Sequence, residues 1–208
     1  NLIKDIISKD YLHPGLKTKL PKKIKFIQFN ELQSVLKNDV DVVVAGVSSI
    51  GIEWFVKQIS KNYKKKLPIV LLTKGLSIVD NELTTLSDKI KDLLEKDGHS
   101  EINISAIKGP CLAAGLANKM RTGTVIANKD VKVCQSLKNM ISTNYYSTEM
   151  SEDISGVELS GAIKNIYSML IGASEGLSNS KATKDVQSKY FLNTAASLIH
   201  RSISEMVE

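Results

Sequence analysis

The sequence predicts an α/β protein, with an incomplete Rossmann-like parallel sheet followed by an all-α domain. Up to residue 148, runs of β-branched residues alternate with helical segments. That alternation is typical of parallel strands joined by crossover helices. From residue 153 onward the pattern is helical only. We therefore expect a sheet domain over residues 1–150 and the start of a helical domain over residues 151–208.

The expected strands are short apolar runs that end in small or polar residues, which favours strands buried on both faces. They cover residues 24–29, 41–47, 68–73, 101–107, 124–127 and 145–148. The expected helices cover residues 1–9, 31–37, 48–61, 81–96, 111–119, 130–141, 154–175 and 187–208, separated near the end by a polar stretch at 178–184.

Composition narrows the class of protein. The chain has 208 residues, of which 42% are hydrophobic and 24% charged, values typical of a globular protein. No run approaches the ~18 apolar residues of a membrane span, and no signal peptide is visible. The net charge of +6 comes from scattered lysines, and the few aromatic residues do not interleave with them. A solvated basic surface is therefore a better interpretation than a nucleic-acid site.

Cysteine and histidine patterns give no sign of a metal or disulfide framework. Cys111 and Cys134 form no CxxC pair, and the three histidines are isolated in the sequence. Two unpaired cysteines are typical of a reducing compartment, so we expect a cytoplasmic protein without a metal site.

Three of the expected strands lead into small or polar residues. Ser48 follows the second strand, Lys74 the third, and Gly109 the fourth. Ligands of open α/β sheets bind beyond the carboxyl ends of the strands, so these positions predict one cleft. Each residue also has a simpler interpretation: Ser48 as a helix N-cap, and Lys74 as a solvated lysine at a strand end.

The segment Gly-Val-Glu-Leu-Ser-Gly-Ala-Ile-Lys-Asn at residues 156–165 lies in the first long helix of the second domain. Apolar residues spaced three and four apart predict one broad buried face, formed by Val157, Leu159, Ala162, Ile163, Ile166, Met169 and Leu170. Lys164 borders that face beside Gly161, where partial loss of hydration would suit a proton donor or acceptor. From spacing alone, a solvated lysine at the helix edge is favoured.

This segment resembles the signature of NAD(P)-dependent glycerol-3-phosphate dehydrogenases. Thr-Lys-Gly-Leu at 73–76 and Gly-Pro-Cys-Leu-Ala at 109–113 resemble further segments of that family, in the same order. The C-terminal stretch at 193–206 also resembles it, and there Arg201 is expected to be structural. The resemblance implies a nucleotide-binding domain over 1–150 and a substrate-binding helical domain beginning at 151.

The resemblance also implies the roles of individual residues. Lys164 would be the catalytic proton donor and acceptor. The substrate-binding residues would be Lys74, Gly109, Cys111, Lys164 and Asn165, and the residues binding NAD or NADP would be Tyr11, Ser48, Lys74 and Ala113. The reaction would be the reversible reduction of dihydroxyacetone phosphate to sn-glycerol 3-phosphate, which feeds glycerophospholipid synthesis. A homodimer is the expected assembly.

Several features depart from the family pattern. Ser48 stands where proline is usual, Cys111 replaces a hydroxyl residue, and Gly115 replaces a glutamate. The family's Gly-x-Gly-x-x-Gly turn is absent, and the chain begins with Asn rather than Met. We therefore expect a middle fragment that lacks its first strand and has little activity alone.

Two alternatives stay open. One is a related dehydrogenase that acts on another hydroxy acid or phosphorylated sugar. The other is a divergent, non-catalytic paralogue that acts as a basic binding module, with Cys111 and Gly115 as traces of lost catalysis.

Overall fold

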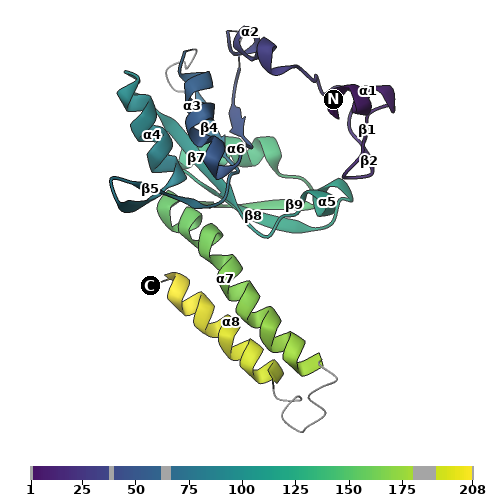
Figure 1. Cartoon of the computed structure of the whole chain (residues 1–208), viewed down its shortest axis with the longest axis vertical. Coiled ribbons are helices and arrows are strands. Elements are labelled where there is room, and N and C mark those ends of the chain that lie inside the picture. The colour runs from purple at the N-terminus through teal and green to yellow at the C-terminus, as the bar shows by residue number, and fades with distance from the viewer. Residues whose placement is uncertain (1, 38–39, 62–66, 180–190, 208) are drawn as a thin grey trace.

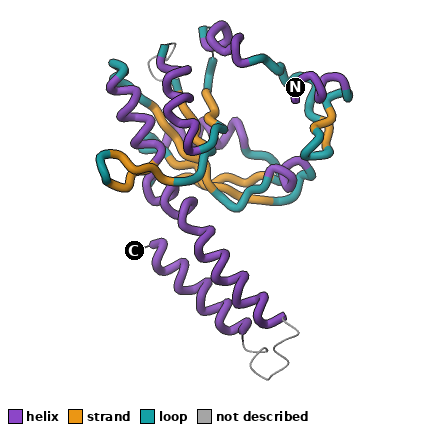
Figure 2. The backbone as a smooth tube through the Cα atoms, viewed as in Figure 1, coloured by secondary structure: helices purple, strands orange, loops and turns teal. Residues whose placement is uncertain are grey.

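The computed structural model describes residues 2–37, 40–61, 67–179 and 191–207. Its centre is a five-stranded sheet in the order β3-β4-β7-β8-β9 (Figures 1 and 2). The strands are β3 (Val43–Ala45), β4 (Pro68–Leu71), β7 (Asn103–Lys108), β8 (Thr122–Ala127) and β9 (Tyr146–Ser151). This architecture confirms the predicted α/β class and four of the predicted sheet strands closely.

The sheet is parallel except at one pairing. β3, β4 and β7 run in one direction, and β8 and β9 are parallel to each other but antiparallel to β7. The reversal follows from the connection between β7 and β8, which contains only the short helix α5 (Ala113–Ala117). A full crossover helix, as the sequence suggested at 111–119, would have returned the chain in the parallel direction.

Helices cover the two faces of the sheet and create two apolar cores. α2 (Leu32–Leu36), α3 (Ile52–Ser60) and α4 (Leu86–Lys96) pack on one face, against the side chains of Ile69, Leu71 and Ile104. α6 (Val131–Ile141) packs on the other face, where Cys134 and Leu137 meet side chains of β4, β7 and β8. The alternation of side chains along each strand supplies both faces.

Two hairpins were not predicted as such. β1 (Leu12–His13) pairs with β2 (Thr18–Lys19) after the short helix α1 (Leu2–Ser8), and β5 (Leu76–Val79) pairs with β6 (Glu82–Thr85). The second hairpin replaces the first turn of the helix predicted for 81–96. Its turn residues Asp80 and Asn81 have φ of 50° and 66°, which Asp and Asn tolerate well in tight hairpin turns.

The strand predicted at 24–29 is wrong. The chain there is irregular and enters a 3₁₀ turn at Phe29–Glu31, after which α2 begins. The backbone N–H of Gln28 donates to the Glu31 side chain at 2.8 Å, so the turn is capped where the strand was expected. Asn30 lies in the middle of this turn.

After the sheet the chain forms a pair of antiparallel helices, α7 (Ile154–Asn179) and α8 (Phe191–Val207), which extend away from the sheet (Figure 1). The Tyr167 hydroxyl of α7 donates to the Glu205 carboxylate of α8 at 2.8 Å and joins the helices, and within α8 the Arg201 side chain donates to the same carboxylate. Most of the polar stretch predicted at 178–184 lies outside the described residues.

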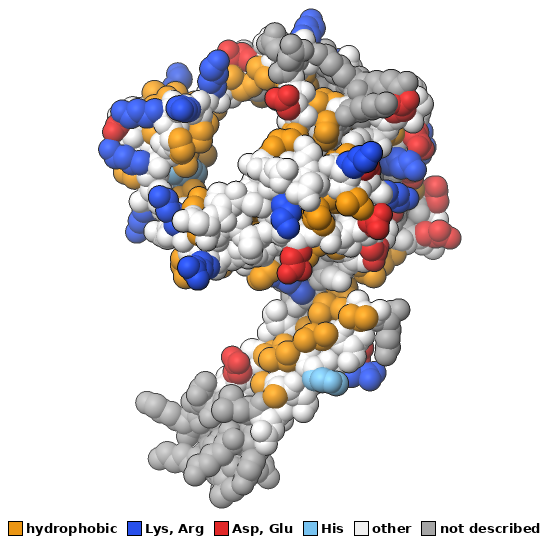
Figure 3. Space-filling view, turned by 180° about the vertical axis from the view of Figure 1, so that it is seen from behind, with side chains coloured by type: hydrophobic (Ala, Val, Ile, Leu, Met, Phe, Trp, Pro, Cys, Tyr) orange, Lys and Arg blue, Asp and Glu red, His pale blue; other side chains and the backbone are white. Residues whose placement is uncertain are grey.

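The broad buried face predicted for α7 is wrong for its second half. Ile166, Met169 and Leu170 are exposed by 56%, 69% and 47%, and Leu159 by 43%. The first turns of α7 pack on the sheet, and among the described residues the main neighbour of α7 is α8. An apolar surface therefore remains uncovered on this helix pair (Figure 3).

Candidate active site

The loops after β3 and β4 lie side by side at the carboxyl ends of these strands. The Thr73 hydroxyl donates to the carbonyl oxygen of Val47 at 2.7 Å. Gly75 has φ of +122°, a conformation that favours glycine, and a Cβ built there would lie 3.7 Å from the Cβ of Ser49. The structure therefore brings the predicted residues Ser48 and Lys74 to the same edge, both exposed.

The third segment, Gly109 to Cys111, leaves β7 in close contact with β8. A Cβ on Gly109 would lie 2.7 Å from the carbonyl oxygen of Gly123 and 2.8 Å from the Cα of Thr124. Only glycine lets the two backbones approach so closely. Cys111 follows with a half-buried thiol, and its N–H donates to the Gly109 carbonyl at 2.9 Å.

Helix α7 reaches this edge of the sheet through a glycine contact. Its first turn is capped by Asp153, whose carboxylate accepts the N–H of Gly156 at 2.8 Å. A Cβ on Gly161 would lie 3.2 Å from the Cγ of Lys108, at the end of β7. Lys164 lies three residues further along and is half-buried, whereas Asn165 is exposed.

Beneath the site lies a buried ion pair that sequence reasoning missed. Lys108 is 5% exposed and Glu158 is 1% exposed, and Lys108 Nζ lies 3.9 Å from Glu158 Oε1. Glu158 Oε2 accepts the backbone N–H of Ser87 at 3.1 Å and a short bond from the Ser87 hydroxyl. Two signals point to the pair: a lysine at the end of a buried strand, and a glutamate between apolar Val157 and Leu159.

Burial governs the electrostatics of this pair. Burial raises the pKa of the Glu158 carboxyl above its ordinary value, opposed by hydrogen bonds from Ser87 and by the charge of Lys108. Burial lowers the pKa of Lys108, while Glu158 opposes that shift and the nearby charge of Lys74 adds to it. Lys74 is therefore close enough to Lys108 for the two positive charges to interact.

The remaining predicted residues lie elsewhere. Tyr11 belongs to the N-terminal hairpin, where its ring centroid lies 5.8 Å from that of Phe26. Figure 1 shows this hairpin well away from α7. Ala113 is exposed at the start of α5. The described residues thus gather Ser48, Lys74, Gly109 and the helix of Lys164, but not Tyr11.

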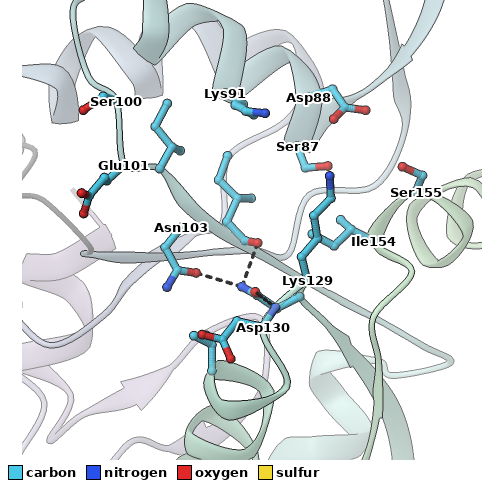
Figure 4. A pocket seen from close by; sticks show the side chains of 14 residues that line it. Ser87, Asp88, Lys91, Ser100, Glu101, Asn103, Lys129, Asp130, Ile154 and Ser155 are labelled. Atoms are coloured by element: carbon cyan, nitrogen blue, oxygen red, sulfur yellow. Dashed lines mark hydrogen bonds between the residues drawn. The ribbon is translucent and has the colours of Figure 1, made fainter.

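The larger of two described cavities lies away from these strand ends. It has about 700 Å³ and is lined by the amino-terminal part of β7 and the first residues of α4, α6 and α7 (Figure 4). Inside it the Asn128 amide bonds Asn103 at 2.8 Å and Ser105 at 2.7 Å. The lining mixes Lys91 and Lys129 with three acidic side chains. We place the candidate site at the strand ends, where the predicted residues converge.

A second cavity of about 450 Å³ is an apolar groove on the α6 side of the sheet. It is lined by side chains in or next to β3, β4, β7 and α6, among them Val44, Leu72 and Met140, which are exposed by 55%, 43% and 57%. β3 is an edge strand, so its outer edge has no strand partner among the described residues. Figure 3 shows an opening in the molecule with apolar side chains at its rim.

The described residues hold neither a cluster of metal ligands nor a helix suited to a membrane. No group of three or more His, Cys, Asp or Glu side chains in that part of the chain could hold a metal ion. No described helix is long and apolar enough to cross a membrane.

Comparison with known proteins gives the relationships of the chain. A family model described as the NAD-dependent glycerol-3-phosphate dehydrogenase N-terminus matches residues 2–134, and the model of the C-terminus matches residues 153–208. The NADP(+)-dependent glycerol-3-phosphate dehydrogenase of Archaeoglobus fulgidus is 31% identical over 196 residues, which are 94% of this chain and 55% of that protein. A Psychrobacter cryohalolentis relative, glycerol-3-phosphate dehydrogenase (NAD(P)+), is 31% identical over 205 residues, 99% of this chain and 42% of its own length.

Solved structures agree on the fold. The glycerol-3-phosphate dehydrogenase of Saccharomyces cerevisiae superposes with a TM-score of 0.74 at 20% identity, over 98% of this chain and 55% of that one. The Dunaliella salina structure gives the same TM-score and identity, over 99% of this chain and 32% of its own. The chain thus has the Rossmann-type α/β fold of these dehydrogenases.

The family models together span both the sheet and the helix pair. The chain belongs to the NAD-dependent glycerol-3-phosphate dehydrogenase family. It spans about half the length of the first curated relatives that it matches.

Proposed function

We propose that the protein is an NAD(P)-dependent oxidoreductase that reversibly reduces dihydroxyacetone phosphate to sn-glycerol 3-phosphate and so feeds glycerophospholipid synthesis. The proposal is supported by one contact within this chain: Gly161 of α7 packs on Lys108 at the end of β7. This contact brings the helix of Lys164 to the strand end that leads into Gly109.

In this proposal Lys164 exchanges the proton at the substrate oxygen. It is half-buried, and Gly161 one turn earlier lets the helix approach the sheet closely. A proton donor must lie within hydrogen-bond reach of the atom that it protonates. Asn165, the next residue, would bond a substrate hydroxyl.

Lys74 and the Gly109 segment would hold the substrate. Lys74 is exposed beside the Gly75 turn, so its ammonium is accessible to a phosphate. The backbone at Gly109 and the thiol of Cys111 would border the substrate carbon chain. A thiol is a weak donor, so we expect a weaker contact there than a hydroxyl would make.

The carboxyl ends of β3 and β4 leave room for part of a dinucleotide. A Cβ on Gly46 would meet nothing within 4 Å, so the end of β3 offers open space beside the exposed hydroxyl side chains of Ser48 and Ser49. These residues and Lys74 would hold the nicotinamide half. Ala113 and the more distant Tyr11 are proposed as contacts of other parts of the dinucleotide. The bound cofactor supplies the hydride, and the protein positions it. In this fold a Gly-x-Gly-x-x-Gly turn binds the pyrophosphate of the dinucleotide. The 208 residues contain no such turn.

The uncovered surfaces support the proposed domain layout. The unpaired edge of β3 and the apolar groove beside it would accept a further strand and helix of the nucleotide-binding domain. We propose that residues 1–150 belong to that domain and 151–208 begin the substrate-binding domain. The exposed apolar side chains of α7 and α8 would be covered by more of the helical domain or by the second subunit of a homodimer (Figure 3).

The proposal is tested with the protein made from its complete reading frame. Absorbance at the nicotinamide band is followed for NADH and for NADPH, with dihydroxyacetone phosphate as substrate and unphosphorylated dihydroxyacetone as the control. We expect oxidation of at least one cofactor with the phosphorylated substrate only. A folded protein that turns over neither cofactor would contradict the proposal.

We also propose a cytoplasmic location, which the two free cysteines support. A free-thiol assay in cell extracts tests this location.

A further inference from the structure

Lys108 joins three parts of the structure from a buried position. Its Nζ donates to the carbonyl oxygen of Thr73 at 2.5 Å and lies 3.4 Å from that of Leu71, so it holds the end of β4 just before Lys74. Its own backbone ends β7 just before Gly109. Its aliphatic stem packs on Gly161 of α7.

Glu158 ties the same helix to another element. Its Oε2 accepts two hydrogen bonds from Ser87, the second residue of α4, where the helix dipole favours a negative charge. Its Oε1 accepts no hydrogen bond from a described residue. The nearby Lys108 ammonium, 3.9 Å away, is therefore the charge that compensates this oxygen.

The spacing along α7 links this pair to the proposed catalytic lysine. Glu158, Gly161 and Lys164 are three residues apart in a continuous helix. A helix is stiff over two turns, so fixing residues 158 and 161 also fixes the backbone at 164. The contacts of α7 with the end of β7 are made by Glu158 and Gly161 in these first turns, and further along the helix Ile166, Met169 and Leu170 are exposed.

We propose that Lys108 and Glu158 are positioning residues that hold the first turns of α7 against the carboxyl ends of β4 and β7, and thereby set where Lys164 lies relative to Lys74. The consequence for catalysis rests on the proposed function. The structural claim does not, because it concerns only how α7 is held.

An alternative role for the pair is purely electrostatic. If Lys108 acted by attracting an anionic substrate, removing its charge and removing the charge of Glu158 would change substrate affinity in opposite directions. If the pair positions α7, both changes have the same sign. A buried charge left without its partner is costly, so each single change should loosen the helix, and removing both charges should loosen it less.

The experiment compares Lys108→Met, Glu158→Gln and the double variant in the protein from the complete reading frame. The matched control is Lys89→Met, which breaks an ion pair with the exposed Glu53 at 2.7 Å. Backbone hydrogen exchange over residues 155–168 is the first measurement. We expect exchange roughly tenfold faster in each single variant, a smaller change in the double variant, and no change in the control. Equal exchange in all proteins would overturn the proposal.

Kinetics give the second measurement, below the unfolding temperature of every variant. We expect kcat to fall about tenfold in both single variants while KM for dihydroxyacetone phosphate changes about threefold or less, with partial recovery in the double variant. Opposite shifts of KM with unchanged kcat would overturn positioning in favour of the electrostatic role. If the wild type is inactive, the proposed function fails and hydrogen exchange still decides the positioning claim. If a single variant does not fold, Glu158→Asp is used in its place. This change keeps the negative charge, but the shorter side chain moves the carboxylate away from its partners.

Discussion

The side-chain amine of Lys108 donates a 2.5 Å hydrogen bond to the carbonyl oxygen of Thr73, the residue before Lys74. This bond joins the ends of two neighbouring parallel strands at the edge where the candidate site lies. The same lysine packs on the helix of Lys164. The positions of the two proposed ligand-binding lysines are therefore linked through a third lysine that faces away from solvent.

The closeness of β7 and β8 predicts a strict requirement for glycine at position 109. In Gly109→Ala the new methyl would lie 2.7 Å from the Gly123 carbonyl oxygen, so the strands must separate. We expect a loss of about 1–3 kcal/mol in the free energy of unfolding, measured with urea. Gly115→Ala is the control, because nothing lies within 4 Å of its Cβ position and α5 should gain up to about 1 kcal/mol. Equal stability of the two variants would contradict the close packing.

The side chain of Thr85 caps the start of α4. Thr85 Oγ1 accepts the N–H of Asp88 at 3.2 Å, and its hydroxyl donates to the Asp88 carboxylate at 2.6 Å. Thr85→Ala removes both bonds and should lower the free energy of unfolding by about 1 kcal/mol. Thr85→Ser keeps the oxygen and should lose less. Denaturant unfolding measures both, and an alanine variant as stable as the wild type would show that the cap contributes nothing.

The N-terminal hairpin contains a titrating group with a predictable pH response. Hydrogen bonds and charge from Lys19 and Lys22, at 2.6 and 2.8 Å, lower the pKa of Asp10 to about 2. Its ordinary value is 3.8, so the unfolded carboxylate takes up its proton first as the pH falls. The stabilisation is therefore present above about pH 4 and is lost between about pH 4 and pH 2.

This pKa can be measured by NMR titration of the Asp10 carboxyl carbon. The value should rise toward 3.8 when Lys19 and Lys22 are both replaced by Met, because both lowering contacts are then removed. A wild-type value already near 3.8 would mean that the two exposed ion pairs do not persist in solution.

Much of the fold follows from sequence pattern, and the exceptions have local causes. The strand Pro68–Leu71 was predicted because its apolar run is buried on both faces. The hairpin Leu76–Thr85 was missed because Glu82–Thr85 fits a helical pattern, whereas the turn at Asp80 and Asn81 is set by backbone conformation. The exposure of Met169 was missed because periodicity shows which residues share a face and not what covers that face.

In the candidate site, too, some residues could be predicted from the sequence and others could not. Ser48, Lys74 and Gly109 could be predicted because strand ends of a parallel sheet meet at one edge. Local signals mark Lys108 and Glu158 one by one, but their pairing could not be predicted, because no local pattern shows that residues 50 positions apart in the sequence become neighbours in a buried site. Tyr11 was suggested by resemblance alone, and the hairpin that carries it lies away from the helix of Lys164.

We propose that Lys164 transfers the proton, and that the fold brings this lysine to the strand ends. The direct measurement is kcat for dihydroxyacetone phosphate reduction by Lys164→Met, made in the protein from the complete reading frame, with circular dichroism to show that it is folded. The control is Lys57→Met, a change of an exposed lysine on α3. We expect a loss of about 100-fold or more for Lys164→Met and none for the control. A folded Lys164→Met protein with turnover close to that of the wild type would contradict the account.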